Sequence, residues 1–242
     1  METITKWGRR AFKLAGHGSE SWEAGHAMSE PSSMIEVHQL HVWLCEISPL
    51  IWRRLLVRSD STIAERHHTL QIAMGWDDAH LHRFHIRGKD YGISRTGGIG
   101  FRDDPRRVRL ADFHFRPNER FLYEYDFGDV WQHVVRVERR LPWDRKRIYP
   151  VCIGGQRAAP PEDCGGPWAF MALQDEYSPG YFLDRYAELL ESIQTGDLDE
   201  ARNQLAELEP LQEWLALKHF DRRQVNRRLK LYALGDGARM WE

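Results

Sequence analysis

Residues 36–47 read EVHQLHVWLCEI, and this stretch indicates the fold class. The two sets of alternating positions are both largely apolar: Val37, His41, Trp43, Cys45 and Ile47 on one face, and Leu40, Val42 and Leu44 on the other. A strand with two apolar faces is typical of the interior of a sheet. Ser48-Pro49 ends the run, and IWRRLLV at residues 51–57 has the pattern of a partner strand.

A helix is expected next. Thr62 followed by Glu65 has the spacing of a capping box. Ile63 and Met74 mark the ends of an apolar stripe with helical period, and Gly75 stands where a left-handed residue ends a helix. A third strand is predicted over residues 80–88. The order β-β-α-β predicts an α+β domain with a mixed or antiparallel sheet and one packed helix.

The second half of the chain changes character. A loop is predicted over residues 89–107, with Gly97, Gly98 and Gly100, and a short turn over 108–113. Residues 120–141 predict two strands around Phe127-Gly128-Asp129. The Gly- and Pro-rich segment after Pro150 predicts irregular structure. Helical periodicity dominates the rest and predicts a helical C-terminal half, with runs at residues 168–173, 182–193, 198–208, 211–217 and 222–231.

Composition limits the function classes. The 242 residues include 34 Lys+Arg against 36 Asp+Glu, so the whole chain has no positive charge to attract nucleic acid. No run approaches the roughly 18 apolar residues of a membrane helix, so no membrane partner is expected. Three cysteines favour a reducing cytoplasm over a disulfide framework. One domain is expected over residues 35–232, between a flexible N-terminal tail (1–34) and a C-terminal tail (233–242); Met34 is an alternative start to Met1.

Four separated blocks resemble the plasmid pRiA4b ORF-3-like family, whose members also occur as passenger proteins of bacterial insertion elements. They are PLIWRRLLV (49–57), HTLQIAMGWDDAHLHRF (68–84), FLYEYDFGDVWQH (121–133) and PPEDCGGPW (160–168), and FDRRQVNRRL (220–229) fits the typical ending. The resemblance implies one α+β domain with a β-grasp-like start. Two positions depart from it: many relatives have glycine at Val130 and cysteine at Ala159.

A metal site is the first candidate chemistry. His133, Cys152 and Cys164 are candidate zinc ligands, and the alternation of His80 and His82 predicts two imidazoles on one strand face. The alternative is that the two cysteines are buried structural residues, because they are far apart and form no C-x-x-C pair. Ala159 also removes a third thiolate.

Acid–base catalysis is the second candidate. Asp126, Asp129 and His133 surround one hairpin, and Glu162-Asp163 lie in the irregular segment that could face it. The alternative is structural: aspartates flanking Gly128 stabilise turns, and Glu162-Asp163 could cap a helix or pair with Arg157.

Nucleic-acid binding is the third candidate. Residues 101–160 carry thirteen basic against nine acidic residues, interleaved with aromatic rings. Exposed rings would stack bases, whereas buried ones would only build the core. The residues assigned to binding are Arg53, Arg54, His80, His82, Tyr125, Trp131 and Arg157.

The sequence predicts a cytoplasmic, non-enzymatic accessory or binding protein with a protein or nucleic acid as partner, and the resemblance implies an association with mobile genetic elements. The alternative is a metal-dependent or acid–base hydrolase. The predicted functional surface combines the hairpin 121–133, the loop 150–167 and the strand 80–86. An exposed apolar patch would favour a protein partner, and convergence of the acidic groups in a pocket would favour the hydrolase.

Overall fold

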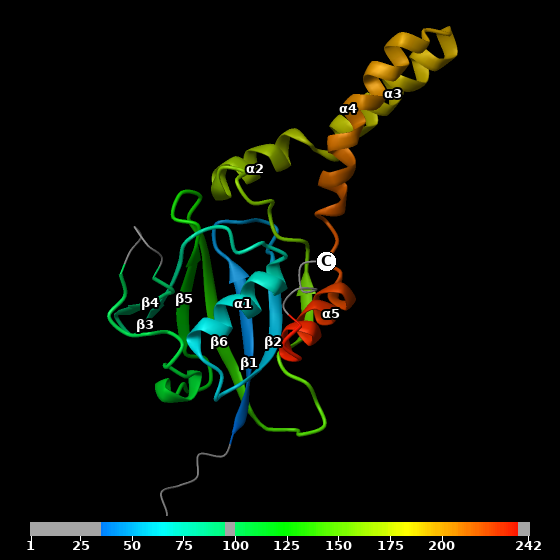
Figure 1. The fold of residues 1–242 in the computed structure, drawn as a ribbon. Helices are drawn as coiled ribbons and strands as arrows, with labels where there is room; N and C mark the ends of the chain where they lie inside the picture. The colour runs from blue at the N-terminus through cyan, green and yellow to red at the C-terminus, as the bar shows by residue number, and fades with distance from the viewer. Residues whose placement is uncertain (1–34, 95–99, 237–242) are drawn as a thin grey trace, which may run out of the picture. The chain divides into compact units, whose positions relative to one another are not determined.

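The structure is a computed structural model that describes residues 35–94 and 100–236, apart from the side chains of residues 209–213 (Figure 1). The predicted N-terminal tail, the alternative start at Met34, Gly97 and Gly98 of the predicted loop, and residues 237–242 of the predicted C-terminal tail lie outside the described residues. The predicted domain boundaries therefore stay predictions.

Seven strands form one sheet in the order β4-β3-β5-β6-β1-β2-β7, and every neighbouring pair is antiparallel. The strands are β1 (Glu36–Leu44), β2 (Trp52–Arg58), β3 (His82–Ile86), β4 (Lys89–Tyr91), β5 (Arg120–Tyr125), β6 (Trp131–Pro142) and β7 (Val151–Gln156). β1 lies between β6 and β2, which confirms its prediction as an interior strand. Of the two sheet types left open by the sequence, the antiparallel one is correct.

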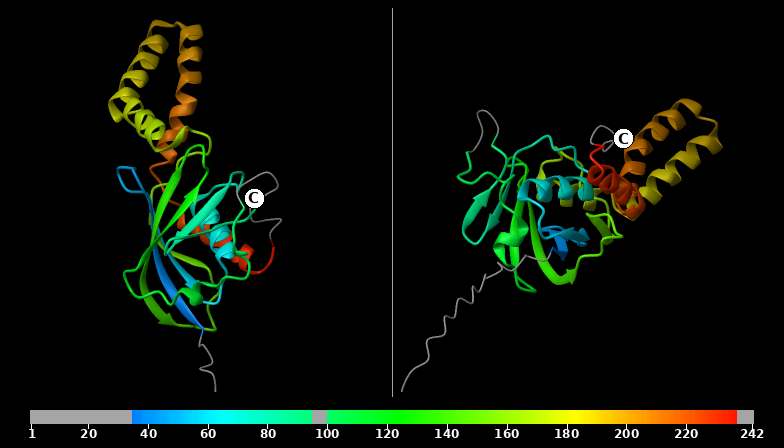
Figure 2. Two further views of the ribbon diagram at one scale, coloured as in Figure 1. Left: turned by 90° about the vertical axis from the view of Figure 1, so that its left-hand side faces the viewer. Right: turned by 60° about the horizontal axis from the view of Figure 1, so that its bottom comes forward.

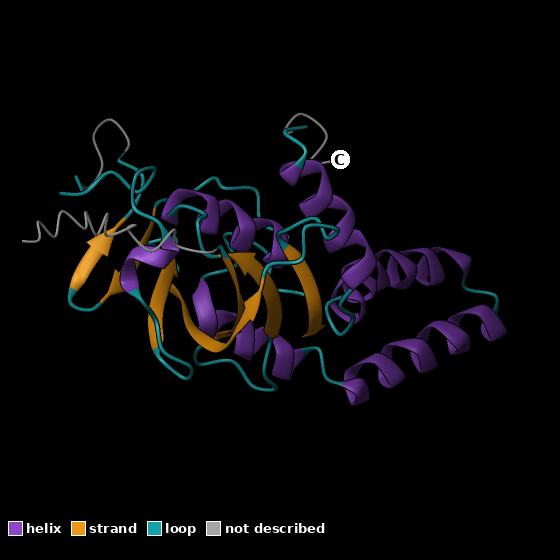
Figure 3. Ribbon diagram, turned by 90° about the horizontal axis from the view of Figure 1, so that it is seen from below, coloured by secondary structure: helices purple, strands orange, loops and turns teal. Residues whose placement is uncertain are grey.

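One face of the sheet is covered by α1 (Ile63–Met74), as Figure 3 shows. Both sequence signals that were predicted to mark the ends of this helix are present. Thr62 and Glu65 form a reciprocal capping box, and Gly75 ends the helix with φ of 89°. The core between helix and sheet includes the fully buried Leu40, Phe84 and Trp76. The predicted α+β class is therefore confirmed.

The C-terminal half is helical, as predicted, with α2 (Gly166–Glu176), α3 (Pro179–Thr195), α4 (Leu198–Ala216) and α5 (Arg222–Ala233). α3 and α4 pack side by side, and α5 packs against β7 and α1 (Figure 2). No helix in the described part of the chain has the length and apolarity needed to cross a bilayer.

Four predictions about elements were wrong. The segment after Pro150 is not irregular, because residues 151–156 form the edge strand β7. Residues 89–91 of the predicted loop form β4, and residues 110–113 of the predicted turn form a 3₁₀ helix. The runs 198–208 and 211–217 belong to the single helix α4. Leu208 and Trp214, on either side of the predicted break, pack in different apolar clusters.

Gly154 and Gly155 favoured an irregular segment in the sequence, but in the structure they allow aromatic rings to pack closely on β7. A Cβ atom at Gly155 would lie 2.3 Å from the ring of Phe220, and one at Gly154 would lie 3.4 Å from the ring of Trp52. Glycine inside a strand often marks such a close approach. Phe220 can therefore cross the strand only because residue 155 has no side chain.

Candidate functional site

His80, Asp126 and Asp163 meet where the loop after α1, the β5–β6 turn and the loop before α2 come together. Nδ1 of His80 lies 3.6 Å from Oδ2 of Asp126, and Nε2 lies 3.2 Å from Oδ1 of Asp163. One carboxylate thus faces each ring nitrogen, and the His80 side chain lies between the two loops. The three side chains also place one ligand atom each within 4.8 Å of the others, close enough to share a metal ion.

Tyr125 and Glu162 form a second contact between the same segments. The hydroxyl of Tyr125 donates a hydrogen bond to Glu162, whose other oxygen accepts the backbone N–H of Asp77 at 2.8 Å. Burial and the bond to Glu162 raise the pKa of Tyr125. Trp76 stacks on Tyr125 at 5.1 Å and donates its indole N–H to the carbonyl of Pro160. The loop before α2 is therefore anchored to α1 and β5.

Asp126 and Asp129 also stabilise backbone. Oδ1 of Asp126 accepts the N–H of Gly128 at 2.8 Å inside the hairpin turn, and Oδ2 of Asp129 accepts the N–H of Gly165 at 3.1 Å. Both bonds are of the kind expected from turn aspartates. The predicted catalytic carboxylates Asp126, Asp129 and Glu162 are thus each engaged by a protein donor, whereas Asp163 is largely exposed.

His133 lies apart from these carboxylates, fully buried in β6. Its Nδ1 donates to the carbonyls of Trp131 (3.1 Å) and Tyr123 (3.3 Å), which leaves the ring neutral with Nε2 buried and without a hydrogen-bond partner among the described residues. Burial lowers the pKa of His133 to about 4. This environment is structural and is not that of a general base working near neutral pH.

The predicted zinc ligands do not converge. In the described residues, His133, Cys152 and Cys164 form no group with ligand atoms within 4.8 Å of one another. Cys152 is buried and its thiol donates to the carbonyl of Gly154 at 3.2 Å. Burial raises the pKa of both thiols, that of Cys164 to about 11. Both cysteines therefore fit the alternative of structural thiols.

His80 and His82 are separated, although the sequence placed them on one strand face. β3 begins at His82, whose ring stacks on His67 with centroids 3.4 Å apart. His67 in turn lies 2.7 Å from Asp78 through its Nε2 atom. The group His67, Asp78 and His82 is a second cluster of metal-ligating types, and the sequence analysis missed it as a site. A helix-to-strand contact of this kind has no signal in sequence spacing.

The residues assigned to binding have mixed environments. Trp131 and Tyr125 are fully buried, so neither ring can stack on a base. Arg54, on the face of the sheet opposite α1, donates two hydrogen bonds to Glu138. Arg157 contributes to a small cavity beside Phe170.

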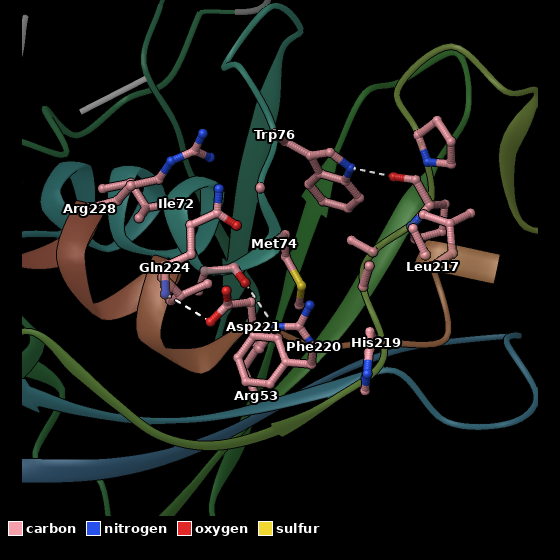
Figure 4. Close-up of a pocket in the computed structure, with 18 of the residues that line it drawn as sticks. Arg53, Ile72, Met74, Trp76, Leu217, His219, Phe220, Asp221, Gln224 and Arg228 are labelled. Atoms are coloured by element: carbon pink, nitrogen blue, oxygen red, sulfur yellow. Dashed lines mark hydrogen bonds between the residues drawn. The ribbon is translucent and has the colours of Figure 1, made fainter. Parts of the chain in front are cut away.

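Arg53 is the predicted binding residue that lies at a cavity. Its side chain points to the α1 side of the sheet, and the cavity has a volume of about 600 Å³. Figure 4 shows Trp76, Arg228, Phe220 and Leu217 around this space. The walls come from the end of α1, the loop 158–162 and the segment 216–228, which includes the start of α5. The contribution of α5 was not predictable from the sequence, because nothing in its basic pattern indicates which helix face packs inward.

A stripe of exposed apolar side chains follows α3. Leu183, Tyr186, Leu190 and Ile193 recur at spacings of three and four residues, which places them on one helix face, and their exposed fractions are 70%, 45%, 56% and 52%. On α4, Leu198 and Leu205 are 64% and 56% exposed. We call these six residues the α3–α4 stripe. Both helices thus expose large apolar side chains on their surfaces.

Comparisons with known proteins agree on one family. The family described as "Plasmid pRiA4b ORF-3-like protein" matches residues 36–228. The chain is 32% identical over 184 residues to the uncharacterized protein y4hQ of Sinorhizobium fredii, covering 75% of this chain and 93% of that protein. The crystal structure of a protein of unknown function, MM3350 from Methanosarcina mazei Go1, is 30% identical with a TM-score of 0.55, covering 79% of this chain and 98% of that one. The resemblance carried by the sequence blocks is therefore confirmed, and the chain belongs to the plasmid pRiA4b ORF-3-like family.

Proposed function

We propose that the protein is a non-enzymatic accessory protein of mobile genetic elements that works in the cytoplasm and binds a partner protein through the α3–α4 stripe. The exposure of these six apolar side chains is the observation that carries the proposal. The link to mobile elements is supported by the family description, which names a plasmid reading frame.

The charge around the stripe indicates the chemistry of the partner. Residues 184–213 contain nine acidic residues against two arginines. Two copies of this acidic hairpin would repel each other, so self-association through the stripe is disfavoured. The matching partner is an amphipathic helix with apolar residues on one face and Lys or Arg beside them.

A nucleic-acid partner is less well supported. The sheet arginines Arg54, Arg83 and Arg140 pair with Glu138, Glu124 and Glu36 respectively. These pairs reduce the positive field that the local charge excess predicts.

Size-exclusion chromatography with light scattering and fluorescence anisotropy test the proposal. We expect a monomer that binds a labelled Leu/Lys heptad peptide at least tenfold more tightly than the same peptide with Glu in place of Lys. The double variant L183S/L190S should lose most of this binding, since each buried leucine contributes about 1.5–3 kcal/mol.

The matched control is the double variant L122S/L234S, which removes two exposed leucines outside the stripe. Equal binding of both peptides, or equal loss in the control, would contradict the proposal. A dimer that L183S/L190S disrupts would assign the stripe to self-association instead.

The hydrolase alternative keeps one supporting observation, the convergence of Asp126 and Asp163 on His80. It is tested by elemental analysis of the protein purified in metal-free buffer, alongside His80→Ala. A stoichiometric metal that is lost in this variant would favour the hydrolase. Absence of metal from the unmodified protein would count against a metal-dependent hydrolase and favour the binding function.

A further inference from the structure

The cavity beside Arg53 contains two guanidinium groups that lack carboxylate partners. Arg53 is 1% exposed, and its hydrogen bonds go to the carbonyl groups of Ala73, Trp52 and Gln156. The Nε atom of Arg228 is buried and has no hydrogen-bond partner in the described part of the chain. Neither arginine forms an ion pair with a described carboxylate. A buried charge without a counter-ion is costly, so the site favours an anion.

Some N–H groups of these two arginines have no hydrogen-bond acceptor among the described residues. Nε and Nη1 of Arg53 donate hydrogen bonds, while Nη2 has no acceptor among the described residues. The ring of Phe220 lies 4.0 Å from the guanidinium carbon and covers one face of the group. Arg228 stands on another wall of the cavity (Figure 4). Positive charge thus reaches the space from two walls.

The nearby carboxylates do not cancel this charge at the donors. Glu162 accepts hydrogen bonds from Tyr125 and from the backbone of Asp77, and Asp221 accepts the N–H groups of Arg223 and Gln224 at the start of α5. Asp77 is exposed. These acidic groups are used by the fold or face solvent.

Apart from His219 and Gln224, most of the remaining lining side chains are apolar. They include the side chains of Ile72, Met74, Trp76, Leu217, Phe220 and Val225. A volume of about 600 Å³ suits a small molecule rather than a single ion. The cavity therefore combines an apolar surface with donors for one negatively charged group.

We propose that this cavity binds a small organic anion, whose carboxylate or phosphate head contacts the guanidinium group of Arg228 and whose apolar body packs against Trp76 and Phe220. Guanidinium groups suit both heads because their N–H fork matches two oxygens of either. This site is distinct from the α3–α4 stripe, so the proposal does not depend on the protein-binding function.

Calorimetry and tryptophan fluorescence test the proposal with defined probes on the full chain. Phenylacetate and phenyl phosphate carry the two candidate heads, and phenylacetamide is the neutral match of the first. We expect one or both anions to bind at least tenfold more tightly than the amide. The head that binds more tightly identifies the ligand class. Equal affinity for the amide, or no binding of either anion, would overturn the proposal.

Variants of Arg228 locate the bound anion. Arg228→Met should weaken anion binding at least tenfold, Arg228→Lys should weaken it less, and Arg145→Met should leave it unchanged, because Arg145 is exposed and lies outside the cavity. Circular dichroism checks that each variant is folded. If Arg228→Met does not fold, the Arg228→Lys variant decides. An unchanged affinity in Arg228→Lys, or a loss no larger than that in Arg145→Met, would refute the assignment.

Discussion

Val130 occupies a backbone conformation that suits glycine. Its φ is 57°, in the left-handed region, and its side chain is 40% exposed. That region costs an L-residue about 1–2 kcal/mol, and the cost is largest for a β-branched side chain. Val130→Gly should raise the free energy of unfolding by about 0.5–1 kcal/mol, because the added flexibility of glycine in the unfolded chain offsets only part of the relief. Urea denaturation measures the change.

The control for this prediction is Val134→Gly in β6, the strand that follows the turn, where the backbone is extended. It should destabilise the protein, since glycine only weakens a strand there. A loss of stability in both variants would show that Val130 is not strained. The resemblance to the family implied that Val130 departs from a glycine, and the left-handed backbone at this position gives a physical reason why glycine would suit it.

His133 makes the stability depend on pH. Its folded pKa of about 4 lies below the ordinary 6.5, so between these values the unfolded chain binds a proton that the folded chain excludes. Stability is therefore fully present above pH 6.5 and falls as the pH decreases toward 4. The slope from one such group is at most about 1.4 kcal/mol per pH unit. His38, whose burial also lowers its pKa to about 4, adds to the same window.

His133→Asn should remove the contribution of this one titrating group to the slope. The amide of asparagine can still donate to the carbonyls of Trp131 and Tyr123 but does not titrate. Denaturation curves between pH 4 and 7 provide the measurement. His114→Asn is the control, since His114 is exposed and its φ of 46° suits asparagine. An unchanged slope in His133→Asn would contradict the assignment of His133 as a buried neutral ring.

At the scale of elements, local signals in the sequence predicted α1 well. Thr62 accepts the N–H of Glu65 at 3.2 Å and donates its own N–H to the Glu65 carboxylate at 2.6 Å. Thr62→Ala should therefore cost about 1 kcal/mol of folding stability, whereas Thr62→Ser, which keeps the acceptor, should cost little. Thermal unfolding of the two variants is the comparison. Equal destabilisation by serine and alanine would mean that the capping oxygen contributes nothing.

Elements defined by distant contacts were not predictable. β7 contains two glycines and was taken as irregular, since its fit to Phe220 and Trp52 depends on residues about 65 and 100 positions away. The same holds for the candidate site, whose parts were predictable only where they do not depend on distant packing. The sequence indicated that the hairpin and the loop before α2 would meet, which is where Asp126, Glu162 and Asp163 lie. It could not indicate that Arg53 and α5 would enclose a cavity, because that depends on how a helix at the end of the chain packs on the sheet.

At the scale of the whole chain, the described residues have two separate apolar clusters. The larger joins the sheet, α1 and the buried Leu229 of α5. The smaller holds α3 and α4 together through Phe182 and Leu208, with Tyr177, Tyr181 and Leu189 packed beside them. Trp214 of α4 packs against the larger cluster and lies 5.3 Å from Tyr177 of the smaller one. The α3–α4 hairpin thus has far less buried apolar surface than the sheet, which is consistent with a surface that gains its remaining contacts from a partner.

Native-state hydrogen exchange in low urea should show two levels of stability. Amide groups of α3 and α4 should open at a lower free energy than those of β1 and β6, because local stability follows buried apolar contact. Leu208→Ala, which removes about 2–4 kcal/mol of packing, should lower protection in the hairpin only. Leu40→Ala, in the central strand, should lower it throughout the chain, since loss of the sheet removes the support of every element. A uniform loss of protection in Leu208→Ala would mean that the hairpin and the sheet unfold as one cooperative unit, and the stripe would then be held rigidly before any partner binds.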